Sequence, residues 1–334
     1  MLNILFVACS GEIDYECHCL FHGLHELKNT TVYTLNDQPY MFADYPSEKR
    51  RLLYGMGFTI AAKIDPFKKH HQSKEEVEKC IMQHFYDLVI YGSIHRCLDL
   101  WDLVRDHYKK EEIICVDGED WITPNCYANF DYNVRMLEFK LPLYKYLGKE
   151  KSANFTKFLL KEINRREEIL NKCISCAIVF KRELNLNLYP QVKPISFAIP
   201  SSIIVNKSPV KSRRLAFIQP GKPETYIYKT EEDYYKGYQE SYWGLTTKKA
   251  GWDCLRHYEI MANGCIPYFP DIYECPNEIM VDFPKEIIKY TNYLFDNNVQ
   301  GGWEVKYYLN QLVDYTRAYL TTKELANYVL SSLS

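Results

Sequence analysis

The first eight residues hold the strongest constraint on the fold of this chain. The run LNILFVA (2–8) is apolar at nearly every position, without alternation between apolar and polar side chains. A strand with one face in water would alternate, so a continuous run is typical of a strand buried on both faces, as in a parallel sheet covered by helices. The run is short and lacks a basic flank, which favours a buried strand over a signal peptide.

Strand-like and helical patterns alternate after this run. The strand-like runs are 31–35, 86–93, 112–120, 176–184 and 194–200, and the helical patterns between them are 14–27, 74–85, 97–108 and 154–173. Such a rhythm predicts βαβ units and a doubly wound parallel sheet.

The same rhythm restarts after a linker-like stretch at 201–212, with RRLAFIQPG (213–221) as a strand and turn. We therefore predict an α/β protein with two Rossmann-like domains, residues 1–205 and 206–334, that face each other across a cleft. The last helical run, 303–331, is expected to pack back on the N-terminal domain.

Composition narrows the class of partner. The chain has 334 residues, with 41 basic and 43 acidic side chains and a formal net charge of -2, so it has no overall attraction to nucleic acid or anionic membrane. No apolar run is long enough to cross a bilayer. Its 12 cysteines follow no disulfide pattern, as expected of reduced thiols in the cytoplasm, or in the host cytoplasm if the chain is viral.

The stretch GWDCLRHYEIMANGCIPYFPD (251–271) predicts one helix that runs into one strand. At 100° per residue, positions 252–263 separate into two sectors. The core-facing sector holds Cys254, Leu255, Tyr258, Met261 and Ala262, and the second sector holds Trp252, Arg256, Glu259 and Asn263. Arg256 and Glu259 could simply pair with each other on an exposed face, and that alternative stays open.

The residues around this helix suit a nucleotide. TTKKAG (246–251) precedes it, and a helix N-terminus attracts phosphate through its free N–H groups and its dipole. Gly264 follows as a C-cap should. Phosphate at the N-terminus, with Glu259 holding both ribose hydroxyls one to two turns on, would be the geometry of a nucleotide site.

The segment RHYEIMANGCIPYFPD (256–271) resembles the donor-site motif of GT-B fold glycosyltransferases, best the small, divergent viral and bacterial members of the exostosin-like or spore-coat-like group. The resemblance implies that residues 206–334 bind a UDP- or GDP-type nucleotide sugar, with Glu259 on the ribose. It implies that residues 1–205 bind the acceptor, and that the activity is hexosyl or pentosyl transfer to a hydroxyl of a glycan, protein or modified nucleobase.

The predicted donor-site residues are Gly221, Lys222, Thr247, Lys248, Lys249, Trp252, Arg256, Glu259, Asn263 and Gly264. Their cations can carry the diphosphate charge, so we predict a reaction without metal or resident cofactor. One departure from the resemblance is Gly251, because many retaining members carry an acidic residue eight positions before the ribose glutamate.

Polar turns follow three of the predicted N-terminal strands, where ligands of parallel sheets bind. Ordinary turn chemistry explains each turn alone, but three at one sheet edge suggest a cleft lining. The acceptor-side candidates are Ser10, Gly11, Gly92, Ser93 and Arg96. The candidates for a catalytic base are Asp117, Asp120 and Asp14.

Two further functions stay open. A glycosyltransferase of modified DNA bases would need a basic face, for which KRR (49–51) and KKHH (68–71) are the hints. A non-catalytic nucleotide- or sugar-binding module would fit the departure at Gly251. Zinc on CHCLFHGLH, through Cys17, Cys19, His22 and His25, is predicted not to bind, because positions 17 and 19 point different ways on a helix.

Overall fold

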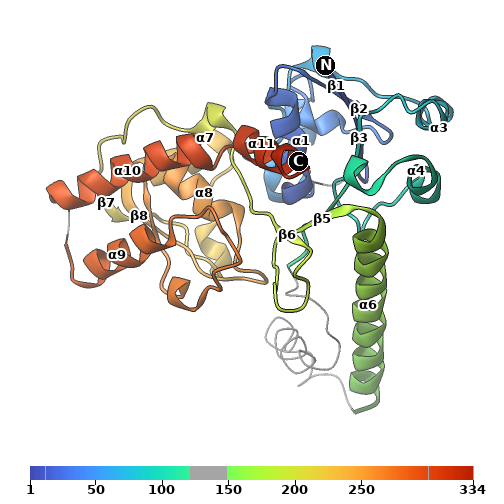
Figure 1. Ribbon diagram of the computed structural model, residues 1–334. Helices are drawn as coiled ribbons and strands as arrows, with labels where there is room; N and C mark the ends of the chain where they lie inside the picture. The colour runs from blue at the N-terminus through green and yellow to red at the C-terminus, as the bar shows by residue number, and fades with distance from the viewer. Residues whose placement is uncertain (12, 121–148, 300, 334) are drawn as a thin grey trace.

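The structure is a computed structural model that describes residues 1–11, 13–120, 149–299 and 301–333, and its elements gather around two parallel β-sheets (Figure 1). The larger sheet has six strands within the described residues, in the order β2-β1-β3-β4-β5-β6. The strands are β1 (Leu2–Val7), β2 (Thr30–Thr34), β3 (Leu88–Tyr91), β4 (Ile113–Asp117), β5 (Ile178–Lys181) and β6 (Lys193–Pro194). β1 is central and pairs in parallel with β2 on one side and β3 on the other.

Helices cover both faces of this sheet. α1 (Tyr15–Glu26) and α11 (Thr322–Ser331) share a core with Ile4 and Phe6 of β1. The opposite core contains Leu5 and Val7, with α3 (Lys74–Met82), α4 (Trp101–His107) and α6 (Lys149–Cys176) on that side. Successive side chains of β1 therefore enter different cores, which is why its sequence is apolar without alternation.

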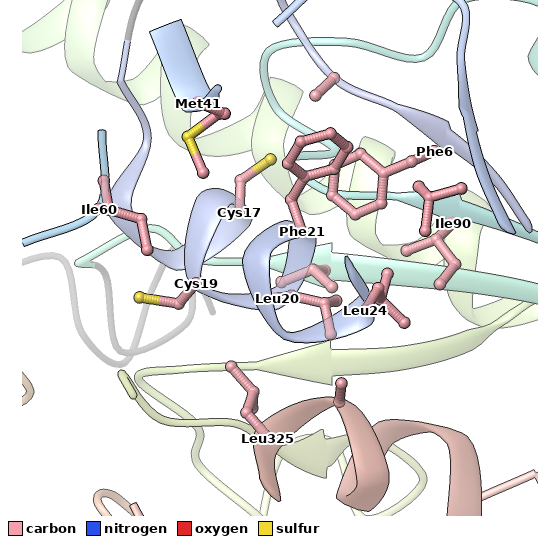
Figure 2. Packing of buried hydrophobic residues seen from close by; sticks show 14 of the residues in the cluster. Phe6, Cys17, Cys19, Leu20, Phe21, Leu24, Met41, Ile60, Ile90 and Leu325 are labelled. Atoms are coloured by element: carbon pink, nitrogen blue, oxygen red, sulfur yellow. The ribbon is translucent and has the colours of Figure 1, made fainter. Parts of the chain in front are cut away.

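α11 lies along α1 although the two helices are far apart in sequence (Figure 1). Leu325 of α11 joins the cluster formed by Phe6, Leu20 and Leu24 (Figure 2). The approach is so close that a Cβ at Gly23 would collide with the backbone carbonyl of Thr322. The last helix thus packs on the same side of the first sheet as α1, and it covers a face of α1 that would otherwise be exposed to solvent.

The smaller sheet has three parallel strands, β7 (Arg213–Leu215), β8 (Ser241–Leu245) and β9 (Ile266–Tyr268). Around it lie α7 (Glu231–Gln239), α8 (Leu255–Ala262), α9 (Lys285–Asp296) and α10 (Trp303–Tyr319). Trp243 of β8, Tyr258 and Met261 of α8 and Leu312 of α10 share its core. A short helix, α2 (Ser47–Arg50), precedes a loop that reaches this second half.

Several sequence expectations differ from the observed elements. The strand predicted at 194–200 is wrong: pairing ends at Pro194, and Ile195 makes one further bond to the Lys181 carbonyl at 3.1 Å. The run 303–331 is broken, because the Thr321 hydroxyl accepts the backbone N–H of Glu324 and starts a new helix. α8 begins at Leu255, not at 252, so Trp252 stands before the helix.

Of two broader expectations, one is confirmed and one is untested. The predicted α/β class with a parallel sheet is confirmed, and that sheet has six strands within the described residues. The division into an acceptor domain, 1–205, and a donor domain, 206–334, stays a prediction. Within the described ranges, the structure contains no helix whose length and apolar character would let it span a bilayer.

Candidate functional site

A cleft of about 580 Å³ lies where loops of the two sheets meet. The first sheet contributes the N-terminal turn of α1, the loop after β4 and Arg182 after β5. The second half contributes Tyr226, Tyr234 of α7, residues 249–251 and 253–256, and Glu259. The segment 54–58 closes a further side. The cleft therefore brings together groups from both halves of the chain.

Glu259 lines this cleft although only 7% of its surface is exposed. Each carboxylate oxygen accepts a hydrogen bond from a hydroxyl: Oε1 from Thr59 and Oε2 from Tyr234. Burial raises the pKa of Glu259, and these two bonds oppose that effect. The structure does not form the exposed pair between Arg256 and Glu259 that the sequence left open, because each side chain has other partners.

The Thr59 contact is part of a wider network. The backbone N–H of Thr59 donates to Glu231 at 2.6 Å, and Arg50 and Lys63 pair with the same carboxylate at 2.6 Å and 3.0 Å. Thr59 has φ +76°, a conformation that a β-branched residue adopts only under strain. The loop that holds Thr59 against Glu259 is thus fixed by ion pairs at the expense of backbone strain.

Arg256 and Lys249 are the cations that the second half presents to the cleft. The Nη2 of Arg256 donates to the Tyr226 hydroxyl at 3.0 Å, and its guanidinium lies 5.3 Å from the centre of that ring. Its Nε and Nη1 are buried and have no hydrogen-bond partner among the described residues. Lys249 is exposed at the cleft wall. Both side chains can therefore receive an anion.

The other predicted donor residues do not line this cleft. Trp252 is buried in the core of the second sheet, with the Lys248 ammonium 4.6 Å from its ring centre. Asn263 ends α8 and donates to the Glu259 carbonyl at 2.9 Å, and Gly264 follows at φ +63°. Gly221 and Lys222 form a turn, where Lys222 bonds Gln219 at 2.7 Å; Thr247 lies in the loop before α8.

The departure at Gly251 has a steric cause. A Cβ at this position would collide with Oε1 of Glu183, a fully buried residue that follows β5. The same oxygen accepts the backbone N–H of Asp253 at 2.9 Å. An acidic side chain at position 251 would need the space that Glu183 already fills.

The three predicted base candidates have different surroundings. Asp14 caps α1 and lies 3.4 Å from Nε of Arg96, and Asp120 pairs with Arg182; both line the cleft. Asp117 does not, which corrects its expected place at the cleft edge. Only 2% of Asp117 is exposed, and its carboxylate contacts Lys181 at 2.8 Å and His95 at 3.2 Å.

These two contacts decide the ionisation of Asp117. Burial raises its pKa, but the Lys181 ammonium and the His95 ring outweigh burial and hold the pKa of Asp117 well below its ordinary value. A carboxylate so strongly stabilised as an anion is a poor proton acceptor. Asp117 is the last residue of β4, and the sequence there does not reveal that its side chain points inward.

The acceptor-side candidates gather at a second hollow of about 500 Å³, lined by Ser10, Gly11, Ser93 and Arg96. Asp14 and Arg96 line both hollows, so the two adjoin at these residues. Gly92 lines neither; a side chain there would meet Phe6 and Cys17, which makes it a packing position.

The cysteine and histidine side chains of CHCLFHGLH are core groups. Cys19 contacts the Ala198 carbonyl at 3.1 Å, His22 contacts the Thr322 hydroxyl at 2.8 Å and His25 contacts the Phe21 carbonyl at 2.8 Å. Within the described part of the chain, no three such side chains stand close enough together to hold a metal ion.

Sequence reasoning missed Glu16, which also lines the cleft. It is the second residue of α1, where an acidic side chain is ordinarily solvated and favoured by the helix dipole. Here only 1% of it is exposed. No signal in the local sequence distinguishes it from a surface residue.

Comparison with known proteins finds similarity among solved structures and none at the level of sequence. No protein-family model and no curated protein matches the sequence. Among solved structures, the chain is similar to Anabaena Alr3699/HepE in complex with UDP and glucose, with 10% identity, a TM-score of 0.44, and coverage of 100% of this chain and 99% of that chain.

Proposed function

We propose that the protein is a glycosyltransferase that transfers a sugar from a UDP- or GDP-type nucleotide sugar to a hydroxyl acceptor. The observation that carries this proposal is the bonding of Glu259. Each of its two carboxylate oxygens accepts one hydrogen bond, Oε1 from the Thr59 hydroxyl and Oε2 from the Tyr234 hydroxyl. The two hydroxyls of a ribose would offer the same pair of donors to the same carboxylate.

The cations of the cleft supply the second part of the donor site. Arg256 has two guanidinium nitrogens without a hydrogen-bond partner in the part of the chain that the structure describes, and it lies on the same helix as Glu259; Lys249 lies on the loop before it. A diphosphate beside them would leave as a stabilised anion. The residue pattern of 256–271, which resembles the GT-B donor motif, supports the same assignment.

The charge of the opposite wall bears on the acceptor. The first-sheet side of the cleft carries four carboxyl groups, Asp14, Glu16, Glu119 and Asp120, against Arg96 and Arg182. A polyanion would be repelled there, since nucleic-acid binding rests on phosphate neutralisation. One basic residue of each of the two basic runs is engaged elsewhere: Arg50 pairs with Glu231, and Lys69 pairs with Asp44 at 2.8 Å. These features favour a glycan or protein hydroxyl over a DNA base.

The test is thermal unfolding with UDP, GDP and their sugar conjugates, with and without EDTA. A ligand at a hundred times its Kd adds about 2.7 kcal/mol to the unfolding free energy, so a clear rise in Tm is expected with EDTA present. Lys249→Ala should reduce the shift, whereas Lys222→Ala, outside the cleft, should not. Absence of a shift with every nucleoside diphosphate would contradict the proposal. Binding without any release of nucleotide from a donor would favour the non-catalytic module.

A further inference from the structure

Glu16 is a buried carboxyl group without a hydrogen bond. It lines the cleft, and neither of its oxygens has a hydrogen-bond partner among the described residues. Buried polar groups in folded proteins are nearly always bonded, so an unbonded carboxyl at a cleft indicates a partner that arrives from outside. Gly118 packs directly against this side chain, since a Cβ there would lie 2.8 Å from the Glu16 Cβ, so the position accommodates Glu16 only as a glycine.

The nearby guanidinium does not satisfy this carboxyl. Nε of Arg182 lies 3.9 Å from Oε2 of Glu16, too far for a hydrogen bond. The five N–H groups of Arg182 are directed elsewhere: to the Gly118 carbonyl from Nε and Nη2, to Glu183 and the Asp253 carbonyl from Nη1, and to Asp120 from Nη2. The positive charge of Arg182 therefore acts on Glu16 electrostatically, but Arg182 donates no hydrogen bond to it.

The other carboxyl groups near Glu16 in the cleft already accept hydrogen bonds or form ion pairs. Asp253 accepts the Tyr258 hydroxyl at 2.9 Å and the backbone N–H of Phe197 at 2.8 Å. Asp120 pairs with Arg182, and Asp14 accepts the backbone N–H of Cys17. Glu119 pairs with Arg166 at 2.9 Å and with Arg96 at 3.6 Å. Among the described acids of the first-sheet wall, Glu16 is thus the one whose two oxygens both lack a hydrogen-bond partner.

Building on the proposed function, we propose that Glu16 is the catalytic residue that binds the attacking hydroxyl of the acceptor and takes its proton. The acceptor oxygen forms a bond to the anomeric carbon, and the bond from that carbon to the diphosphate oxygen breaks. The electron pair of the broken bond leaves with the diphosphate, and the hydroxyl proton passes to the Glu16 carboxylate. The displacement is direct, so the anomeric configuration inverts.

The ionisation of Glu16 gives this role a signature. Burial raises the pKa of Glu16 to about 8, opposed by Arg182 and assisted by Asp253 and Asp14. The charged groups around it, by element, are Asp14 at its own helix cap, Asp120 after β4, Arg182 and Glu183 after β5, and Asp253 before α8. A base with this pKa acts in its ionised form, so kcat/KM should rise with pH through about 8.

The experiment measures release of UDP or GDP from UDP-glucose and GDP-mannose, with water as the acceptor. Glu16→Gln should retain UDP binding and lose about 10²- to 10⁴-fold in release rate, the range for a general base. Its rate should also lose the rise through about pH 8. Glu16→Asp, which keeps the carboxyl but withdraws it, should give an intermediate rate. Glu26→Gln, at the other end of α1 and outside the cleft, should behave as the wild type.

The outcomes separate the two claims. A Glu16→Gln protein that binds UDP and releases nucleotide at the wild-type rate would overturn the role of Glu16 and leave the proposed function standing. A flat pH profile of the wild type between 6 and 9 would do the same without any variant. A wild type that binds no nucleotide, or binds it and never releases it from a donor, would overturn the proposed function and this inference with it.

Discussion

Glu259 and Glu16 line the same cleft from opposite sides, and they differ in what the protein gives them. Both are buried, and burial raises the pKa of both. Glu259 accepts two hydroxyls from the protein, whereas Glu16 accepts no hydrogen bond from any residue that the structure describes. A ligand that binds Glu259 must replace hydrogen bonds from Thr59 and Tyr234. A ligand that binds Glu16 forms hydrogen bonds there without replacing any from a described residue.

The two glutamates are also expected to differ in what their removal does to the stability of the fold. Removing Glu259 would strand the hydroxyl of Tyr234 and leave that of Thr59 with Tyr235 as its remaining partner, which costs free energy of folding. Removing the Glu16 carboxyl would take away a buried acid that has no compensating hydrogen bond among the described residues. A buried acid with a raised pKa at a cleft is a candidate functional group, which is the role proposed for Glu16.

The largest expected effect concerns stability and pH at Glu16. Its folded pKa of about 8 lies above its ordinary value of 4.5, so the folded state binds the extra proton between these values. The stabilising contribution is complete below about pH 4.5 and is lost as pH rises to about 8. Glu16→Gln has no such loss, so its unfolding free energy relative to the wild type should rise by a few kcal/mol, at about 1.4 kcal/mol per unit of pKa difference.

Denaturant unfolding of the wild type and Glu16→Gln at pH 5, 7 and 9 measures this change directly. Asp253, whose pKa burial raises to about 6, is present in both proteins, so its own burial is common to them and only its coupling to Glu16 enters the difference. Parallel pH profiles for the two proteins would mean that Glu16 is solvated or bonded, and the comparison with Glu259 would fail.

A smaller effect is expected at Thr59. Thr59→Val keeps the β-branched shape and removes the hydroxyl that occupies Glu259. Because a ribose would then displace one protein hydrogen bond fewer, UDP affinity should increase about two- to tenfold, the equivalent of one neutral hydrogen bond of about 0.5–1.5 kcal/mol. Isothermal titration checks this value.

Tyr235→Phe is the matched control for Thr59→Val. The Tyr235 hydroxyl contacts Thr59 at 2.9 Å and Glu231 at 2.9 Å but does not contact Glu259. Weaker UDP binding by Thr59→Val, with Tyr235→Phe unchanged, would show that Thr59 helps to hold the nucleotide and does not compete with it.

Sequence patterns could predict what depends on neighbouring residues. The continuous run of β1 predicted a strand between two cores, and the motif at 256–271 put Arg256 and Glu259 on one face of a helix that reaches the cleft. β8 was missed because SYWGL follows a helical pattern directly and no Gly or Pro marks the boundary.

What the sequence could not predict depends on contacts between distant segments. Asp117 ends β4 and Asp120 lies three residues on, but Lys181 and His95 contact the first in the interior and Arg182 pairs with the second at the cleft. Glu16 is buried because groups from the rest of the chain surround it, among them Gly118 and Arg182. No pattern within α1 contains that information.

The central claim is that Glu259 is the ribose-binding group, and a two-by-two binding measurement tests it most directly. UDP and its 2′,3′-dideoxy analogue are titrated into the wild type and Glu259→Ala. A charge-assisted contact is worth about 1.5–3 kcal/mol, so UDP affinity should fall about ten- to a hundredfold in the variant. The dideoxy analogue should bind the wild type weakly and lose little more on substitution. A folded Glu259→Ala protein that binds UDP as tightly as the wild type would contradict the donor-site assignment.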